Sequence, residues 1–410
     1  MRRSWLALSA LIATSSAAAA CAPRPAVISP PLGSAITVGT ILSLTGSQAV
    51  NGQMAKEGYL YCQGWINDKG GIYLKGVGHQ LSLDIVDDQS RPSIAAATTE
   101  HLITDNHDTV LLGPSNDATA SRAAPVAEQH QVPLLSSGAS SDSIFNNHYL
   151  YLFSVLAPRS RQLQGVVDMA LAQDPKPQSV AILYASDSLS AEVANATAIY
   201  ANARGLPVIY GNSYPSGVND VSGQLGAAAA AGAEIILEVG HPAESVRTVQ
   251  QAQQMNIQPK LFGFSDGPGG DRFTADLHKA ANFAVGATQW APAARNRISY
   301  FLDSFHYALA FASQFGHMPD QYAAAATVAC LTLEVAIERA ASTESAKVRD
   351  ALAATDLNTF FGQIKFDDRG ANAVKPVYVQ QVQSGRAVLI WPPDVASARP
   401  RYPDPGWAKR

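Results

Sequence analysis

Three short loops rich in glycine and small hydroxyl residues could bind a polar ligand. They cover residues 43–47, 113–119 and 136–141, and each follows a run of residues typical of a buried strand. In an open parallel sheet, ligands bind just beyond the carboxyl ends of the strands. Hydroxyls and approachable backbone N–H groups there suit a small polar or anionic solute. The loops do not suit a catalytic centre, which would need a nucleophile and a base.

Strand and helix patterns alternate along the chain and predict the elements that position these loops. The first series has strands at 36–42, 80–87, 109–112 and 132–136, and helices at 52–68, 92–105 and 117–130. A second series follows Pro158, with strands at 179–184, 207–210, 234–239 and 260–264, and helices at 160–173, 188–203, 218–231 and 242–256. Alternation of this kind implies parallel, doubly wound sheets. The sequence therefore predicts an α/β fold with two such domains.

The last third of the chain does not repeat this alternation. Long helices are expected at 297–315 and 320–341, and a short one at 344–353. Residues 362–383 look like two strands around a turn at 367–370. The proline-rich stretch 391–410 is expected to lie on the surface.

The composition limits the possible partners and cofactors. The chain of 410 residues is long enough for two domains with sizeable cores. Its formal net charge is −4, with 29 basic and 33 acidic residues spread evenly, so nucleic acid is not an expected partner. The nine histidines are scattered and show no ligand spacing, so neither a metal nor another cofactor is expected.

The first 20 residues resemble a signal peptide. Arg2 and Arg3 form a positive region, residues 5–13 are apolar, and residues 15–20 are small. Cys21 follows directly, and two alternatives remain: cleavage before a lipid-modified Cys21, or ordinary cleavage within the alanine run. The proline-containing residues 21–35 would form a stiff tether.

The two remaining cysteines, Cys62 and Cys330, both lie in helical patterns. Buried free thiols are one interpretation. A disulfide in an oxidising compartment is the other. The sequence leaves both open.

Eight short motifs in a fixed order carry a family resemblance. The chain resembles the leucine/isoleucine/valine-type periplasmic binding proteins, which feed ABC transporters, over roughly residues 36–395. The motifs are Leu44-Thr45-Gly46, Ile66-Asn67-Asp68-Lys69-Gly70-Gly71-Ile72, Asp87-Asp88-Gln89-Ser90, Leu112-Gly113-Pro114, Ala124-Pro125-Val126-Ala127, Val132-Pro133-Leu134-Leu135-Ser136, Gly362-Gln363-Ile364-Lys365-Phe366-Asp367 and Gln380-Gln381-Val382-Gln383-Ser384-Gly385.

The resemblance implies two doubly wound parallel-sheet lobes joined by three crossings, the type I (Venus-flytrap) arrangement. Lobe 1 would comprise residues 36–158 and 292–374, and lobe 2 residues 159–291 and 375–395. Residues 396–410 would form a surface tail.

The resemblance also implies that lobe 1 loops hold a ligand α-carboxylate. The matching positions are Asp117, Gly138, Ala139, Ser140 and Ser141. Ser140 would bond the carboxylate, cap a helix, or do both. Asp117 is a departure, because a serine is common there and an ionised aspartate would repel an anion. A shift of the local match by one or two residues would place Ser115 or Thr119 at this contact instead. Alternatively, Asp117 would cap the helix that follows.

In lobe 2, the resemblance implies an acidic contact to a ligand ammonium. Asp266 is the nearest carboxylate, and its alternative role is that of a turn aspartate. His241 could reach the cleft from lobe 2. Tyr322 would line the pocket or pack in the core, and Trp290 would lie at the cleft mouth or pack at the hinge.

Three positions depart from the family near the cleft. A family aromatic position in lobe 2 is Leu189 here. A family arginine and aspartate near the first crossing are replaced by Ser154 and Arg159. These departures leave the lobe 2 contacts less defined than those of lobe 1.

The resemblance thus implies an exported, periplasmic, monomeric solute-binding component of an ABC importer, partnered by an inner-membrane permease. It would close on its ligand by hinge motion. A carboxylate-bearing solute is expected, first an apolar or branched-chain amino acid, then an aromatic acid or an amide. A sensor of the same fold is the alternative. An enzyme is not expected, because no histidine lies in a motif near Ser140 or Asp266.

Overall fold

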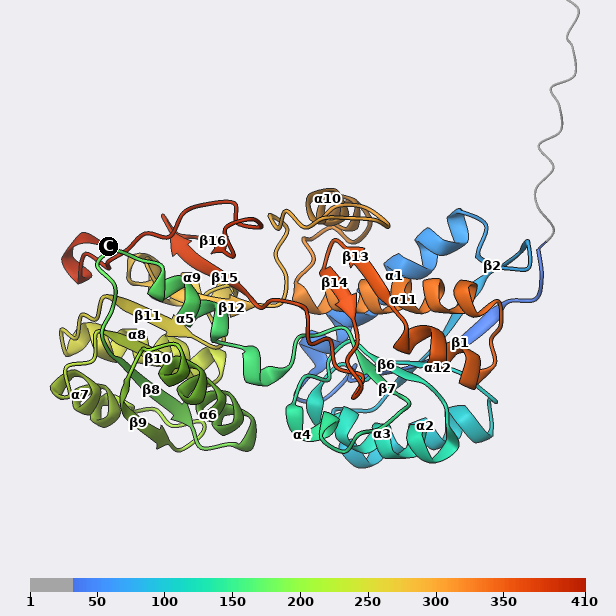
Figure 1. Ribbon diagram of the computed structural model, residues 1–410, viewed down its shortest axis with the longest axis horizontal. Helices are drawn as coiled ribbons and strands as arrows, with labels where there is room; N and C mark the ends of the chain where they lie inside the picture. Colours follow the sequence, from blue (N-terminus) through green and yellow to red (C-terminus); the bar gives the residue numbers. More distant parts are fainter. Residues whose placement is uncertain (1–31) are drawn as a thin grey trace, which may run out of the picture.

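The computed structural model describes residues 32–410, and the predicted signal peptide and Cys21 lie outside them. The chain forms two bodies side by side along the long axis (Figure 1). The first, lobe 1, has a parallel sheet in the order β4-β1-β5-β6-β7. Its strands are β1 (Ile36–Leu42), β4 (Leu81–Asp87), β5 (Leu111–Leu112), β6 (Leu134–Ser136) and β7 (Leu152–Ser154).

The second body, lobe 2, has a seven-stranded sheet in the order β16-β15-β12-β11-β10-β8-β9. Strands β8 to β12 pair in parallel, and β15 and β16 pair antiparallel at one edge. They are β8 (Val180–Ala185), β9 (Val208–Tyr214), β10 (Ile235–Val239), β11 (Leu261–Phe264), β12 (Val285–Thr288), β15 (Tyr378–Gln383) and β16 (Arg386–Trp391). The predicted α/β fold with parallel-sheet cores is confirmed.

Helices cover both faces of each sheet, and their apolar sides form four main cores. The helices of lobe 1 are α1 (Ala49–Asp68), α2 (Pro92–Thr104), α3 (Asp117–His130), α4 (Asp142–Phe145), α10 (Ser304–Phe315), α11 (Gln321–Ala340) and α12 (Ser345–Ala353). Those of lobe 2 are α5 (Gln164–Leu171), α6 (Ser188–Ala203), α7 (Ser222–Ala230), α8 (Pro242–Gln254) and α9 (Asp271–Leu277). Burial on both sheet faces explains why most strands read as continuous apolar runs.

Three connections cross between the lobes, after β7, after β12 and before β15 (Figure 1). Trp290 follows β12 at the second crossing and is buried. Its ring packs edge-on against Tyr307 and Phe360 of lobe 1, with centroids 5.6 and 6.1 Å away. Trp290 therefore packs at the hinge, which was one of the two roles expected for it.

A disulfide joins the two long helices of lobe 1. Cys62 of α1 and Cys330 of α11 are bonded, and both are buried. The alternative of free thiols is therefore wrong. The bond closes a loop of 268 residues and ties the first half of lobe 1 to the part that returns from lobe 2.

Two predictions for the last third are corrected. Helix α10 begins at Ser304 rather than 297, because the Asp303 carboxylate caps it by accepting the N–H of His306 at 2.8 Å. Residues 362–383 do not form one hairpin. They contribute to two hairpins. One pairs β13 (Asp356–Thr359) with β14 (Gly362–Lys365), and the other pairs β15 with β16. The turn of the first hairpin ends at Gly362, whose φ of 112° favours glycine. An unpredicted hairpin, β2 (Ile72–Leu74) with β3 (Val77–His79), follows α1.

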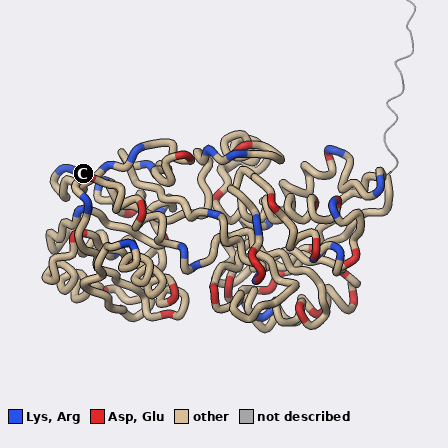
Figure 2. The backbone as a smooth tube through the Cα atoms, in the orientation of Figure 1, with Lys and Arg blue, Asp and Glu red and all other residues tan. Residues whose placement is uncertain are grey.

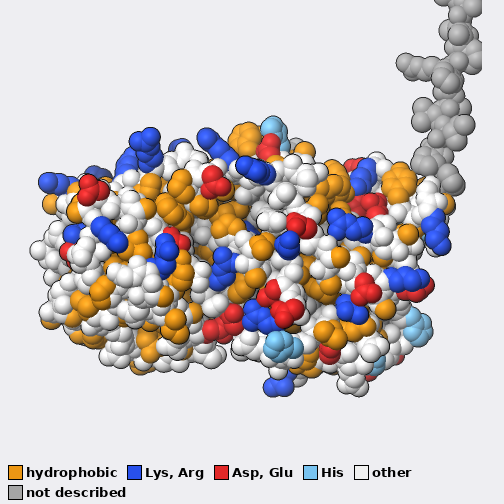
Figure 3. Space-filling view, in the orientation of Figure 1, with side chains coloured by type: hydrophobic (Ala, Val, Ile, Leu, Met, Phe, Trp, Pro, Cys, Tyr) orange, Lys and Arg blue, Asp and Glu red, His pale blue; other side chains and the backbone are white. Residues whose placement is uncertain are grey.

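Charged residues are interspersed along both lobes (Figure 2), and on the face seen in Figure 3 acidic and basic side chains alternate rather than gather. Within residues 32–410, no helix is both long and apolar enough to span a membrane. The same residues contain no cluster of acidic, histidine or cysteine side chains that could hold a metal ion.

Candidate ligand-binding site

The three hydroxyl-rich loops meet at the carboxyl edge of the lobe 1 sheet. The Ser43 N–H contacts the Ser115 hydroxyl at 3.4 Å, and the Ser136 hydroxyl donates to the carbonyl of Pro114 at 2.7 Å. Gly138 lies so close to the 113–119 loop that a Cβ on it would approach the Ser115 carbonyl carbon to 2.0 Å. Glycine at 138 thus lets the second and third loops pack directly on each other.

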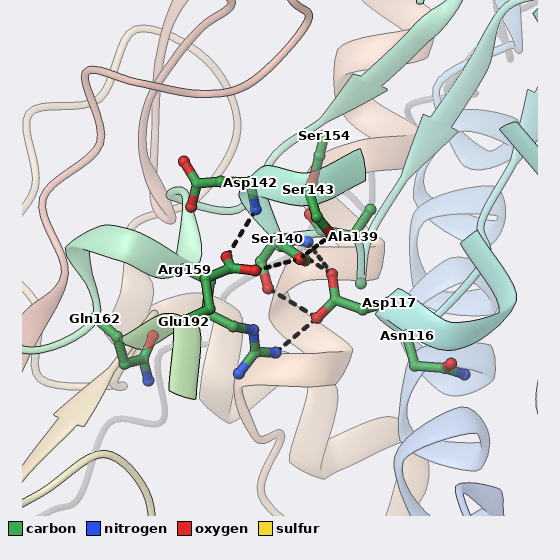
Figure 4. A network of polar contacts seen from close by, with 12 residues as sticks. Asn116, Asp117, Ala139, Ser140, Asp142, Ser143, Ser154, Arg159, Gln162 and Glu192 are labelled. Carbon is green, nitrogen blue, oxygen red and sulfur yellow. Dashed lines mark hydrogen bonds and ion pairs between the residues drawn. The ribbon is translucent and has the colours of Figure 1, made fainter. Parts of the chain in front are cut away.

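Asp117 lies at the centre of a polar network (Figure 4). Its Oδ1 accepts the backbone N–H groups of Ser140 at 2.6 Å and Ser141 at 2.7 Å. Its Oδ2 accepts the Ser140 hydroxyl at 3.2 Å and Nη2 of Arg159 at 2.7 Å. The side chain is only 6% exposed. A buried carboxylate requires such pairing, and here one guanidinium and three further donors supply it.

Neither helix-capping expectation for this loop holds. The N-cap of α3 is Asn116, whose side chain accepts the Thr119 N–H at 3.0 Å, and Asp117 is the first helical residue. The N-cap of α4 is Ser141 rather than Ser140, and its side chain makes no capping bond. The side chains of Asp117 and Ser140 bond to each other instead of to the helix ends.

The remaining predicted loop donors also have internal acceptors. The N–H groups of Gly138 and Ala139 donate to the Ser136 hydroxyl oxygen at 3.0 and 2.8 Å. Together with the two N–H groups bound to Asp117, all four backbone donors of residues 138–141 are paired within the chain.

Arg159 begins the short helix η1 (Arg159–Arg161) in the first crossing. Burial lowers its pKa, but the adjacent Asp117 charge and hydrogen bond outweigh this, so the pKa lies above the ordinary arginine value. Its Nε is buried and has no partner among the described residues, and Nη1 has none either. Arg159 is therefore a permanent cation with unused donors.

Asp266 follows β11 at the carboxyl edge of the lobe 2 sheet. The residue is exposed, yet burial by surrounding protein raises its pKa. A side chain that solvent reaches but that protein atoms surround on most sides is typical of a carboxylate in a recess of the surface. One oxygen accepts the N–H of Gly267 at 2.8 Å, as a turn aspartate would. The charges of Arg159 and His241 act on it and lower its pKa in part.

Two other predicted residues lie near this carboxylate. Tyr322, in the first turn of α11, is partly exposed; burial raises its pKa, and the Asp266 charge raises it further. His241 is the N-cap of α8 and contacts Asp187 through Nε2 at 3.2 Å. Asp117, Ser140, Ser141, Arg159, Asp266 and Tyr322 form what we call the interlobe site; His241 lies at its lobe 2 border.

Glu192 bridges the two lobes beside this site. From α6 in lobe 2, its carboxylate accepts the Ser141 hydroxyl at 2.7 Å and the Asp142 N–H at 2.8 Å, both in lobe 1 (Figure 4). Burial raises the pKa of Glu192, and these two hydrogen bonds oppose that shift. The lobes are thus in direct polar contact.

Comparison with known proteins identifies the family. A model of the family described as periplasmic binding protein matches residues 35–387. The chain belongs to this family. Leu/Ile/Val-binding protein homolog 7 of Brucella abortus (strain 2308) is 26% identical over 416 residues, covering 96% of this chain and 99% of the relative. The predicted Leu/Ile/Val-type resemblance is confirmed, and the chain is a substrate-binding protein, not an enzyme.

Solved structures agree with the fold. LivJ from Streptococcus pneumoniae str. Canada MDR_19A, in complex with isoleucine, aligns with a TM-score of 0.70 at 20% identity, over 86% of this chain and 97% of that protein. A substrate-binding protein of Desulfitobacterium hafniense in complex with Leu aligns with a TM-score of 0.71 at 20% identity, over 87% and 100%. Family membership implies an exported protein.

The contacts that Arg159 and Glu192 make in the site are not predicted by the sequence. Arg159 differs from the family pattern near the first crossing, and Glu192 lies within an ordinary helical pattern. The sequence does contain one indication of this site. It has an acidic residue at 117 and a basic residue at 159, both unexpected for the family, and in the structure the two form an ion pair.

Proposed function

We propose that this chain is the solute-binding component of an ABC importer. It captures a small amino-acid-like solute between its lobes, closes about the three crossings and docks on an inner-membrane permease. Ligand binding would shift a population of open and closed forms.

One observation carries the proposal. Arg159 and Asp266 have opposite charges, and the Arg159 charge lowers the pKa of Asp266. Nε of Arg159 has no partner among the described residues, and the Asp266 carboxylate accepts the Gly267 N–H through one oxygen. Arg159 lies in the first crossing and is tied to lobe 1 by its ion pair with Asp117, whereas Asp266 lies in lobe 2. A solute with an oxygen acceptor at one end and an N–H donor close by would contact both and hold the lobes together.

The choice of solutes to test follows from this pair and from the relatives. Arg159 suits a carbonyl or carboxylate oxygen, and Asp266 suits an ammonium or amide nitrogen. Isoleucine and leucine in the two solved relatives support aliphatic amino acids and their close derivatives as the first candidates. Aromatic acids and small amides complete the set.

A thermal-shift screen of the purified exported protein tests the proposal. A ligand present at about 100 times its Kd stabilises the protein by about 2.7 kcal/mol. We expect at least one amino acid, aromatic acid or amide to raise the melting temperature. If millimolar concentrations of every member leave it unchanged, the proposed ligand class is wrong.

The importer role has its own test. Cells that lack this gene should lose uptake of the radiolabelled solute found in the screen, and a plasmid copy should restore it. Normal uptake in the deletion strain would contradict the role. Lipid on Cys21 and a monomeric state remain predictions; metabolic labelling with a fatty acid, compared in a Cys21→Ala variant, tests the lipid.

A further inference from the structure

The carboxylate of Asp117 is bound as a ligand carboxylate would be. Its two oxygens accept two adjacent backbone N–H groups, one hydroxyl and one guanidinium, all between 2.6 and 3.2 Å. Charge-assisted hydrogen bonds of this kind are the strongest recognition elements for a carboxylate. The loop at 136–141 therefore holds a carboxylate that belongs to the protein itself.

No backbone N–H of residues 138–141 is left for a solute. Gly138 and Ala139 donate to Ser136, and the Ser141 hydroxyl donates to Glu192. Among the described groups of the network, the unused donors are those of Arg159 at Nε and Nη1. Arg159 is thus the charged donor of this network that can recognise an oxygen of the solute.

A second carboxylate is poorly matched to this arrangement. It would share the Arg159 charge with Asp117, which already binds Nη2 at 2.7 Å. Glu192 and Asp266 also interact electrostatically with Arg159 and add further negative charge. Like charges at a shared site disfavour the ionised form of one of them. An uncharged carbonyl accepts the same hydrogen bond from Arg159 without that repulsion, and an amide nitrogen can donate to Asp266.

We propose that Asp117 replaces the solute's carboxylate in lobe 1, so that the site selects a carboxamide or related amide over the free carboxylic acid. This inference rests on the proposed function and specifies its ligand class. Asp117 is then the residue that determines specificity, and Arg159 is the contact to the solute carbonyl.

Matched pairs of acid and amide test the selection in the wild-type protein. Calorimetric titration with leucine against leucinamide, and isoleucine against isoleucinamide, should give at least tenfold tighter binding of the amide. Binding of a simple small amide, with no binding of any acid, also supports the inference. Tighter binding of the free amino acids overturns it and leaves the proposed function intact. If no acid or amide binds, the proposed function fails and this inference fails with it.

A second experiment needs no known ligand: it removes the Asp117 carboxylate and asks whether acetate binds in its place. Asp117→Ala leaves the N–H groups of Ser140 and Ser141 and the Arg159 guanidinium unpaired. Sodium acetate should then raise the melting temperature of the variant by several degrees more than sodium chloride at equal ionic strength. Asp142→Ala is the matched control, since the Asp142 carboxylate accepts the N–H and hydroxyl of Ser160 at 2.9 and 3.0 Å and forms no ion pair within residues 32–410.

The acetate experiment can refute the assignment, and a second variant covers the case in which Asp117→Ala does not fold. Equal effects of acetate and chloride on Asp117→Ala would overturn the assignment of a carboxylate-binding loop. If Asp117→Ala does not fold, Asp117→Asn keeps the size and one acceptor but removes the charge. The ratio of amide to acid affinity should fall in that variant by at least fivefold, and an unchanged ratio would overturn the role of Asp117.

Discussion

Replacing Glu192 with alanine should weaken lobe closure. Its carboxylate accepts two hydrogen bonds from lobe 1, at 2.7 and 2.8 Å. A hydrogen bond to a charged group contributes about 1.5–3 kcal/mol. Glu192 is only partly buried, so we discount the pair to about 2 kcal/mol in total. That energy changes the ratio of closed to open forms by about 30-fold.

Two assays detect this change, whichever form dominates without ligand. If the open form dominates, Glu192→Ala should weaken binding of the best solute from the screen by about 30-fold in a calorimetric titration. If the closed form dominates, the ligand-free variant should show a larger radius of gyration in small-angle X-ray scattering.

The control variants separate closure from a general loss of stability. Glu192→Gln can still accept the Asp142 N–H, so it should lie between wild type and alanine. Glu234→Gln changes a lobe 2 glutamate that bonds only within its lobe, to Lys260 and Gln178. Wild-type affinity and scattering in Glu192→Ala would refute the bridge between the lobes.

Two predictions concern stability. The double variant Cys62→Ser, Cys330→Ser should lose about 4 kcal/mol of unfolding free energy in urea titrations, because the bond closes a very long loop; a loss below about 1 kcal/mol would contradict this. Burial raises the pKa of Glu238 to about 8, so between about pH 5 and pH 8 the native state holds more protons than the unfolded chain. Stability should fall by up to about 4 kcal/mol as pH rises through that range, and Glu238→Gln should flatten the profile; an equal slope in both proteins would contradict it.

The alternating strand and helix patterns predicted the fold because they reflect local periodicity and burial. Strands such as β10 are buried on both faces and read as apolar runs, so their positions could be predicted closely. The hairpin of β13 and β14 could not, since its strands have four residues each and its register depends on the turn at Gly362. Helix α10 begins later than predicted because the Asp303 carboxylate caps it.

The location of the site could be predicted from the sequence, but the hydrogen bonds and ion pairs within it could not. The loops at 113–119 and 136–141 follow strands, so their convergence could be expected. The partners of Asp117 lie 23, 24 and 42 residues away in sequence, and Glu192 contacts a hydroxyl 51 residues away. Such contacts depend on the tertiary arrangement and leave no periodic signal. The disulfide, across 268 residues, is the extreme case.

We propose that a solute binds between the lobes and contacts the Asp266 carboxylate. Calorimetric titration of the best solute into wild type, Asp266→Asn and Asp220→Asn tests it directly. Asp220 is a matched control, because it is also exposed and also accepts an N–H in its own turn, from Ser222 at 2.9 Å. Hydrogen bonds from Ser222 lower its pKa, whereas burial raises that of Asp266. We expect one site per chain and about 10- to 100-fold weaker binding for Asp266→Asn alone. Equal affinity in all three proteins would contradict the claim.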